Sequence, residues 1–209
     1  MNMISQTAFV RAVGIDTIST ITDSQAIALQ KVGISFVVRY VESLTSNEII
    51  SILSAGLALM PVAYSKAGGW MPSATIGTQD GNNMVSDLKK LNIPKGVTTW
   101  CDLEGMGGTA ADTIAYAEAW GACVEAAGYI PGVYVGAGIT IDSAQLYALN
   151  NIHAYWHSCS TVPDVESCGY MMIQLNPPDQ EICGVEVDFN VIQKDHNGRY
   201  PIWAILAKP

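Results

Sequence analysis

The sequence predicts an α/β protein that folds as a compact (β/α)8 TIM-type barrel. Short runs rich in β-branched and aromatic residues alternate with longer segments of helical character along the 209 residues. Such alternation is typical of a parallel sheet, and eight strand-like runs in about 200 residues fit a small barrel. The last connections carry no clear helical pattern, so we expect the late helices to be shortened or missing. A doubly wound sheet is the alternative, although no strand is followed by GxGxxG or a P-loop.

The first half of the chain contains three expected strands and two helices with clear start signals. Thr22 or Asp23 caps the first helix, and the second opens with the capping-box pattern Thr45-x-x-Glu48. The elements are expected in the order strand 10–15, helix 23–32, strand 36–41, helix 45–55 and strand 57–64.

The second half begins with a glycine-rich loop that contains Gly68, Gly69 and Trp70. The later elements are expected as helix 78–91, strand 97–103, helix 109–127, strand 129–135, helix 141–149, and strands 153–157, 170–174 and 185–189. No linker, repeat or low-complexity tract interrupts this order. We therefore expect a single domain over residues 1–209.

Composition excludes several classes of protein and partner. Hydrophobic residues make up 49% of the chain and charged residues 14%, which is typical of a globular protein. A net charge of −9 with ten scattered basic residues disfavours nucleic acid as a partner, because phosphate binding depends on clustered Lys and Arg. The apolar runs are far shorter than the roughly 18–20 residues needed to span a bilayer, so we expect no membrane span.

The five cysteines and three histidines indicate neither a metal site nor a cofactor. No pair of cysteines has CxxC spacing, and His153, His157 and Cys159 match no common ligand pattern. Reduced thiols are therefore expected. Cys159 and Cys168 flank a short polar loop and would be able to form a disulfide in an oxidising compartment.

The stretch 97–108, VTTWCDLEGMGG, contains the carboxylates on which the functional prediction depends. Asp102 and Glu104 end the fourth strand, and because alternate residues of a strand share a face, both side chains point the same way. Asp16 follows the first strand and Asp188 ends the eighth. Active sites of such barrels lie at the C-terminal ends of the strands, so these four acids should meet across the barrel mouth.

A cluster of carboxyl groups is suited to the cleavage of a glycosidic bond. Crowded acids raise one another's pKa, and one of them can then hold a proton at neutral pH. Glycoside hydrolysis uses one such proton donor beside a second, ionised carboxylate. Taken singly, Asp16 could cap a turn and Asp188 could anchor a loop. The match of acids at three strand ends favours a shared catalytic site.

Other side chains near the strand ends are candidates for substrate binding. Aromatic faces stack on sugar rings, which favours Tyr64 and Trp70 beside the glycine-rich loop. Arg39 is unusual in an apolar strand, and it either pairs with an acid such as Glu42 inside the barrel or holds a catalytic carboxylate. The remaining candidates are Tyr134, which fits core or site equally well, Trp156, and Gln174 as a hydrogen-bond donor at the mouth.

Several motifs resemble those of known glycosidases. GID at the first strand, CDLEG at the fourth, PGVYVG at the fifth and GVEVDFNV at the end are similar to motifs of the glycoside hydrolase family 25 lysozymes. The resemblance is closer to the DUF1906 group of glycoside-hydrolase-like domains, and it includes VVRYVES, LMPVAYS and GTQDGNNMVSDLKKLNIPKG. It covers residues 10–195.

The resemblance implies a TIM-type barrel and muramidase-like chemistry. Matched by motif, Glu104 is similar to the family 25 catalytic acid, and Asp102 to the neighbouring carboxylate that stabilises positive charge on the sugar. Asp16 and Asp188 match the flanking acids. We therefore interpret the chain as a lysozyme-type enzyme that cleaves peptidoglycan, causing bacteriolysis, without metal or cofactor. The alternative is a non-catalytic glycan-binding or interaction domain that retains the barrel.

The N-terminal residues MNMISQTAFVRAVGID lack a basic region followed by a long apolar stretch and a small-residue cleavage site. No signal peptide is therefore expected. A cell-wall hydrolase with this N-terminus would be made in the cytoplasm and exported by phage lysis or a specialised secretion system.

Overall fold

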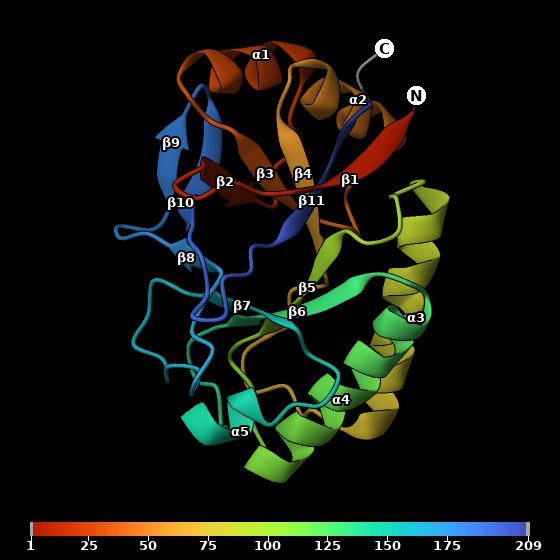
Figure 1. The fold of residues 1–209 in the computed structure, drawn as a ribbon, viewed down its shortest axis with the longest axis vertical. Coiled ribbons are helices and arrows are strands. Elements are labelled where there is room, and N and C mark those ends of the chain that lie inside the picture. Colours follow the sequence, from red (N-terminus) through yellow and green to blue (C-terminus); the bar gives the residue numbers. More distant parts are fainter. Residues whose placement is uncertain (1, 208–209) are drawn as a thin grey trace.

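Eight strands close into a barrel in the computed structural model, which describes residues 2–207 (Figure 1). The barrel strands are β2 (Val13–Thr17), β3 (Phe36–Tyr40), β4 (Ala58–Val62), β5 (Thr98–Leu103), β6 (Ile130–Val135), β7 (Ala154–His157), β8 (Met172–Gln174) and β10 (Val185–Ile192). Each pairs with the next, and β10 pairs with β2 to complete the ring. The expected barrel is confirmed.

Helices lie between the earlier strands and cover the outside of the barrel (Figure 1). They are α1 (Asp23–Lys31), α2 (Ser46–Ser54), α3 (Ala74–Lys90), α4 (Ala110–Ala126) and α5 (Ser143–Tyr147). Within residues 2–207 no helix follows β7 or β8, as expected, and the helix expected over 141–149 is reduced to the short α5. None of the described helices is long and apolar enough to cross a membrane.

The helix starts follow from side-chain caps. Each first turn has backbone N–H groups without a partner in the helix, and a polar side chain just before the helix accepts a hydrogen bond from one of them. The capping residues are Thr22, Thr45, Ser73, Thr109 and Asp142. Helix α3 therefore begins directly after Ser73, earlier than the expected position 78.

The eighth barrel strand runs opposite to the expected direction. β10 is antiparallel to both of its neighbours, β2 and β8, with Asp188 paired to Asp16 and Asn190 paired to Gln174. Asp188 lies in the middle of β10 and does not end it, because the strand continues to Ile192. The residue still reaches the barrel mouth, because the middle of an antiparallel β10 lies beside the C-terminal end of β2. The expected place of Asp188 beside Asp16 was correct, whereas the expected strand direction and the expectation that Asp188 ends the strand were wrong.

Three further strands were not expected from the sequence. β1 (Met3–Thr7) and β11 (Ile202–Leu206) form an antiparallel ribbon that brings both ends of the described chain together (Figure 1). This ribbon attaches to β4 through Ala204 and Leu59, beside the place where β4 and β5 share only one residue pair. β9 (Gln180–Ile182) forms a hairpin with β10. The pairings of β1, β11 and β4 join segments far apart in the sequence, which show no local signal of each other, whereas β9 and β10 are joined by a two-residue turn at Cys183 and Gly184.

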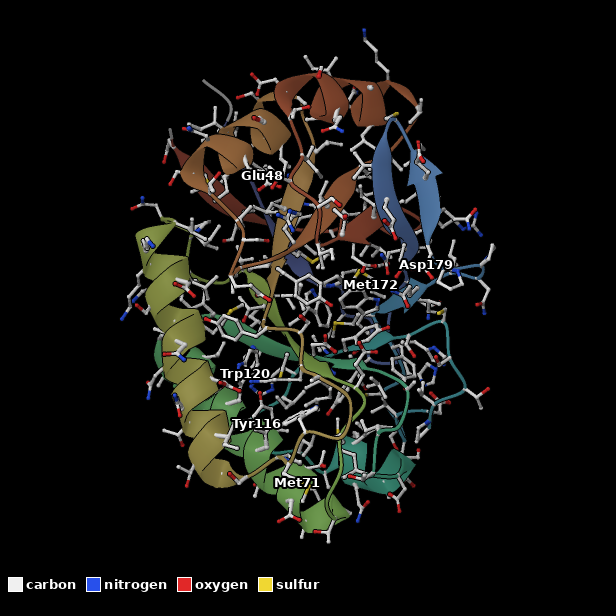
Figure 2. The ribbon with its side chains drawn as sticks, turned by 180° about the vertical axis from the view of Figure 1, so that it is seen from behind. Glu48, Met71, Tyr116, Trp120, Met172 and Asp179 are labelled. Carbon is white, nitrogen blue, oxygen red and sulfur yellow. The ribbon has the colours of Figure 1, made fainter. Side chains whose placement is uncertain are left out.

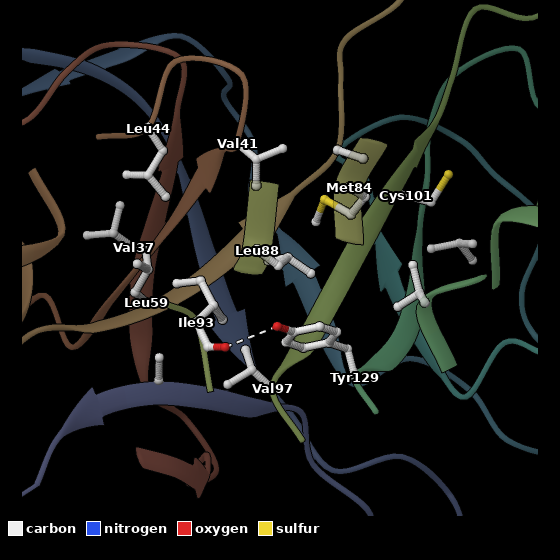
Figure 3. Packing of buried hydrophobic residues seen from close by; sticks show 14 of the residues in the cluster. Val37, Val41, Leu44, Leu59, Met84, Leu88, Ile93, Val97, Cys101 and Tyr129 are labelled. Carbon is white, nitrogen blue, oxygen red and sulfur yellow. Dashed lines mark hydrogen bonds between the residues drawn. The ribbon is translucent and has the colours of Figure 1, made fainter. Parts of the chain in front are cut away.

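The barrel wall separates two apolar layers. Val37, Leu59 and Cys101 face outward and pack with Met84 and Leu88 of α3 (Figure 3). The outward direction expected for Cys101 is thus confirmed. The interior is filled by large side chains that include Phe36, Met60, Trp100, Trp156, Met172 and Trp203.

Arg39 faces the helix layer, so the expected pairing with Glu42 inside the barrel is wrong. Its partner is Glu48 on α2, with Nε 2.6 Å from Oε1, and both side chains are buried. Arg39 also donates to the carbonyl of Thr17 (2.8 Å), and Glu48 accepts the N–H of Ile21 (3.0 Å). The Glu48 N–H donates to the hydroxyl of Thr45, as in a capping box. The reciprocal bond to the Thr45 N–H does not form, because the Glu48 carboxylate binds Arg39.

Replacement of Arg39 by Met should lower the free energy of unfolding by about 3–5 kcal/mol, because it leaves the carboxylate of Glu48 buried without a countercharge. Urea denaturation of the variant checks this value. The double variant Arg39→Met/Glu48→Met should recover most of the loss. Equal destabilisation by the single and double variants would contradict an ion pair as the cause.

Candidate active site

Two carboxylates on adjacent strands share one side-chain amide. Asp16 is buried near the end of β2, and its Oδ2 accepts hydrogen bonds from Nδ2 of Asn190 (2.6 Å) and Nε2 of Gln174 (3.2 Å). The same Nε2 of Gln174 donates to Oδ2 of Asp188 (2.9 Å). Strands β2, β8 and β10 thus meet at one cluster of polar groups inside the barrel mouth.

Hydrogen bonds to the side-chain oxygens of Gln174 and Asn190 fix the orientation of both amides. Oε1 of Gln174 accepts from the hydroxyl of Tyr134 (2.9 Å) and from the N–H of Cys159 (3.1 Å). Oδ1 of Asn190 accepts from the indole N–H of Trp156 (2.8 Å). With their oxygens occupied, both amides must turn their NH2 groups toward the acids. Tyr134 and Trp156 therefore support the site from within the barrel.

Asp102 is buried on the inner face of β5 with one oxygen bonded and one free. Its Oδ2 accepts from the hydroxyl of Tyr40 (3.1 Å), while Oδ1 has no partner in the described structure. A buried carboxylate oxygen without a donor is costly when the group is ionised. This environment therefore favours the protonated form of Asp102.

Glu104 lies directly after β5, in the turn that leads to α4, and is only partly buried. Gly136, at the end of β6, provides the space for it. A Cβ built on Gly136 would lie 2.3 Å from Cβ of Glu104, 3.0 Å from its Oε2 and 3.0 Å from Cε1 of Tyr134. The carboxyl group of Glu104 therefore packs over the glycine and beside the Tyr134 ring.

Burial raises the pKa of all four acids, and repulsion within the group adds to it at Asp16, Asp102 and Glu104. Burial is the main cause for Asp16, whose pKa rises to about 7, and the charges of Asp188 and Glu104 raise it further. The pKa of Asp102 is well above its ordinary value, first from burial and then from Glu104. Burial also raises the pKa of Glu104, with a further contribution from Asp188, and that of Asp188 itself. The cluster can therefore hold protons near neutral pH.

An open cleft of about 210 Å³ lies beside Asp16 and Asp188. Its walls are the end of β2 with the residues after it, Tyr40, and the β9–β10 hairpin. Asp179, at the edge of this hairpin in Figure 2, donates its N–H to Oδ1 of Asp188 (2.7 Å). The lining residues are Asp16, Thr17, Ile18, Ser19, Tyr40, Asp179, Glu186, Val187 and Asp188, none of them basic.

None of the six sequence-predicted binding residues lines this cleft. Tyr134, Trp156 and Gln174 belong to the polar cluster around its acids, and the other three are bound elsewhere. Arg39 is on the other side of the barrel wall, bound to Glu48. The hydroxyl of Tyr64 donates to Oδ2 of Asp87 on α3 (2.6 Å). Trp70 packs against Tyr116 of α4, and its indole N–H donates to the carbonyl of Glu104 (2.8 Å).

Sequence reasoning missed Asn190 and Gly136, and it did not predict the hydrogen bond from Tyr40 to Asp102. Strand alternation could have found Asn190, which is two residues beyond Asp188 and so shares its face. All five cysteines are free thiols, including Cys159 and Cys168. Within residues 2–207 no group of His, Cys, Asp and Glu side chains is arranged to hold a metal ion.

Comparison with known proteins gives the family. The model of the Rv2525c-like, glycoside hydrolase-like domain matches residues 27–176, which is more than half of the chain. The chain belongs to this family. The match includes Asp102 and Glu104, whereas Asp16 and Asp188 lie outside it. No curated protein sequence matches the chain.

Solved structures with the same fold are mostly cell-wall hydrolases. An uncharacterized B. stearothermophilus protein has a TM-score of 0.69 at 22% identity, over 87% of this chain and 95% of that one. The catalytic domain of endolysin ply40 from bacteriophage P40 of Listeria monocytogenes has a TM-score of 0.60 at 14% identity, over 89% of this chain and 95% of that one. A family 25 glycosyl hydrolase from Bacillus anthracis has a TM-score of 0.59 at 12% identity, over 90% of this chain and 91% of that one. The glycoside hydrolase-like fold therefore resembles that of lysozymes.

The raised pKa of Asp16 predicts that stability falls as pH rises between about 4 and 7. In the folded state Asp16 keeps its proton to about pH 7, whereas the unfolded chain releases it near 3.8. Since the folded state binds more protons in this window, raising the pH favours unfolding, by up to about 4 kcal/mol for Asp16 alone.

Urea denaturation across this pH range measures the effect. The variant Asp16→Asn, which cannot titrate at this position, should show a smaller fall than the wild type. Identical slopes for the two proteins would contradict a raised pKa at Asp16.

Proposed function

We propose that this protein is a lysozyme-type glycosidase that cleaves the glycan strands of peptidoglycan by carboxylate acid/base catalysis. The observation that supports it is the group of four acids from β2, β5 and β10, which crowd at the barrel mouth with raised pKa values. A structural neighbour, the autolysin LytC from Streptococcus pneumoniae, has been solved with a synthetic peptidoglycan ligand. That likeness, at 10% identity, supports the choice of polymer only by analogy.

Glu104 is the proton donor in this proposal. It is more accessible than its neighbour Asp102 on β5, and burial together with the charge of Asp188 keeps its pKa raised. A group in this state can hold a proton at near-neutral pH and deliver it to the glycosidic oxygen as the bond breaks.

The other acids act on the sugar ring and on water. Asp102, which accepts a hydrogen bond from Tyr40, stabilises positive charge on the sugar in its ionised form, which the developing positive charge favours over the protonated form found in the free protein. Asp16 and Asp188, joined by the amide of Gln174, form a second pair that stabilises the same charge or positions the attacking water. The site of action is the bacterial cell wall, reached through phage lysis or a specialised secretion system.

Replacement of Glu104 by Gln should reduce the release of reducing ends from purified cell walls about 10²–10⁴-fold, the usual contribution of a general acid. Glu166→Gln is the matched control, because Glu166 is exposed and distant in sequence from the cleft residues. The control should keep wild-type activity. Wall types with different peptide stems and sugar modifications should be compared.

One outcome would contradict enzymatic activity, and another would contradict the role of Glu104. If wild-type protein releases no reducing ends from any wall type but pellets with the walls, the domain binds glycan without cleaving it. Wild-type activity in Glu104→Gln would show that another group supplies the proton.

A further inference from the structure

Two loops at the barrel mouth are joined through the backbone around Glu104. The loop between β4 and α3 meets the turn after β5, with Gly69 N–H donating to the Gly105 carbonyl (2.6 Å) and Gly107 N–H donating to the Trp70 carbonyl (2.7 Å). Between these bonds, the indole N–H of Trp70 donates to the carbonyl of Glu104 (2.8 Å). The indole thus binds the backbone of the residue that we propose as the proton donor.

The Trp70 ring is itself held by two neighbours. It packs edge to face against Tyr116 of α4, with the ring centroids 4.9 Å apart and the planes at 68°. The ammonium of Lys66 lies 5.7 Å from the indole centroid, within the range of a cation–π contact. Tyr116 is labelled on α4 in Figure 2.

A buried acid closes this arrangement into a ring of contacts. Oδ2 of Asp80 on α3 accepts from Nζ of Lys66 (2.7 Å) and from the hydroxyl of Tyr116 (2.9 Å). Asp80 is 7% exposed, so its charge depends on these donors. We name Lys66, Asp80 and Tyr116 the Asp80 cluster.

The close approach of α3 to α4 makes this cluster possible. Gly77 and Gly81 lie on the α3 face that touches α4, one on each side of Asp80 in the sequence. A Cβ on Gly77 would be 2.3 Å from the carbonyl oxygen of Tyr116, and one on Gly81 would be 2.9 Å from that of Trp120. Only glycine permits this contact between helix backbones, which brings Asp80 within reach of the Tyr116 hydroxyl.

The backbone of Glu104 is also confined from its other side. Gly105 N–H donates to the carbonyl of Ala137 (2.7 Å), and Gly136 packs against Cβ of Glu104. The backbone and Cβ of Glu104, from which its carboxyl group extends, are therefore held by contacts from both adjacent loops.

We propose that Trp70 is a positioning residue for Glu104 and that the Asp80 cluster holds Trp70 in place. Trp70 then acts through the Glu104 backbone, which differs from the sugar stacking expected from the sequence. The inference rests on the proposed function only for the role of Glu104 as proton donor. Proton transfer requires the donor to be within hydrogen-bond reach of the leaving oxygen, so a small displacement of Glu104 slows the bond-breaking step.

The test uses Trp70→Phe, which keeps an aromatic ring against Tyr116 and removes the N–H donor. Trp120→Phe is the matched control, because Trp120 is a buried indole on α4 whose Nε1 has no hydrogen-bond partner. Both variants lose the same atoms, and only Trp70 contacts Glu104. Lys66→Met, at a partly exposed position, is a second variant that loosens the Asp80 cluster without shortening an aromatic side chain.

Trp70→Phe should lower kcat about fivefold with little change in KM, the effect expected for the loss of one ordinary hydrogen bond in the bond-breaking step. It should also shift the titration of Glu104 toward the ordinary range of a glutamate, because a released carboxyl group moves into solvent. The shift is measured by carbon NMR of labelled glutamate carboxyls, with the Glu104 signal assigned by its absence in Glu104→Gln. Lys66→Met should move both quantities in the same direction.

Trp120→Phe is expected to lower thermal stability while leaving the kcat and the Glu104 titration unchanged. The inference is overturned if folded Trp70→Phe matches the wild type in the NMR titration, or if Trp120→Phe shifts that titration equally. If Trp70→Phe fails to fold, an unshifted Glu104 in Lys66→Met overturns it. The NMR readout needs no turnover, so an inactive wild type would contradict the proposed function and still leave the positioning test decisive.

Discussion

The amide of Gln174 bridges the carboxylates of Asp16 and Asp188 at the place where the barrel closes, and the arrangement of the candidate site depends on this contact. β10 inserts antiparallel between β2 and β8, so residues from these three strands meet where the ring closes. Two acids at this position would repel each other inside an apolar barrel. The amides of Gln174 and Asn190 supply donors to both, and their own oxygens are satisfied by Tyr134, Cys159 and Trp156.

The same packing gives the site its electrostatic character. Trp100, Trp156 and Met172 fill the barrel below the acids and exclude water from one side of them. Burial is accordingly the leading cause of the raised pKa of each acid, ahead of the charges of its neighbours. The chain thus keeps protonated carboxyl groups at the mouth at some cost to stability, as is usual for functional sites. The buried pair of Arg39 and Glu48, on the far side of the wall, ties β3 to α2 and contributes nothing to the cleft.

Much of the fold and the position of the acids could be predicted from local patterns. The caps at Thr22 and Thr45 and the strands around Val37, Cys101 and Val133 follow from residue type and alternation, which depend on near neighbours. Alternation also placed Asp102 on the inner face and Cys101 on the outer one. The partner of Arg39 was misjudged because a charged residue between apolar ones indicates only that some countercharge is near.

The sequence by itself determined which side chains of each strand share a face, and together with the barrel that it predicted, it indicated that Asp16, Asp102, Glu104 and Asp188 lie at one mouth. Only the tertiary structure decided the antiparallel direction of β10, the ribbon of β1 and β11, and the bonds that Trp70 and Trp156 make. The physical reason is the distance along the chain over which the deciding interactions act. Alternation and capping are set within a few residues, whereas strand direction and indole partners depend on contacts between segments far apart in the chain.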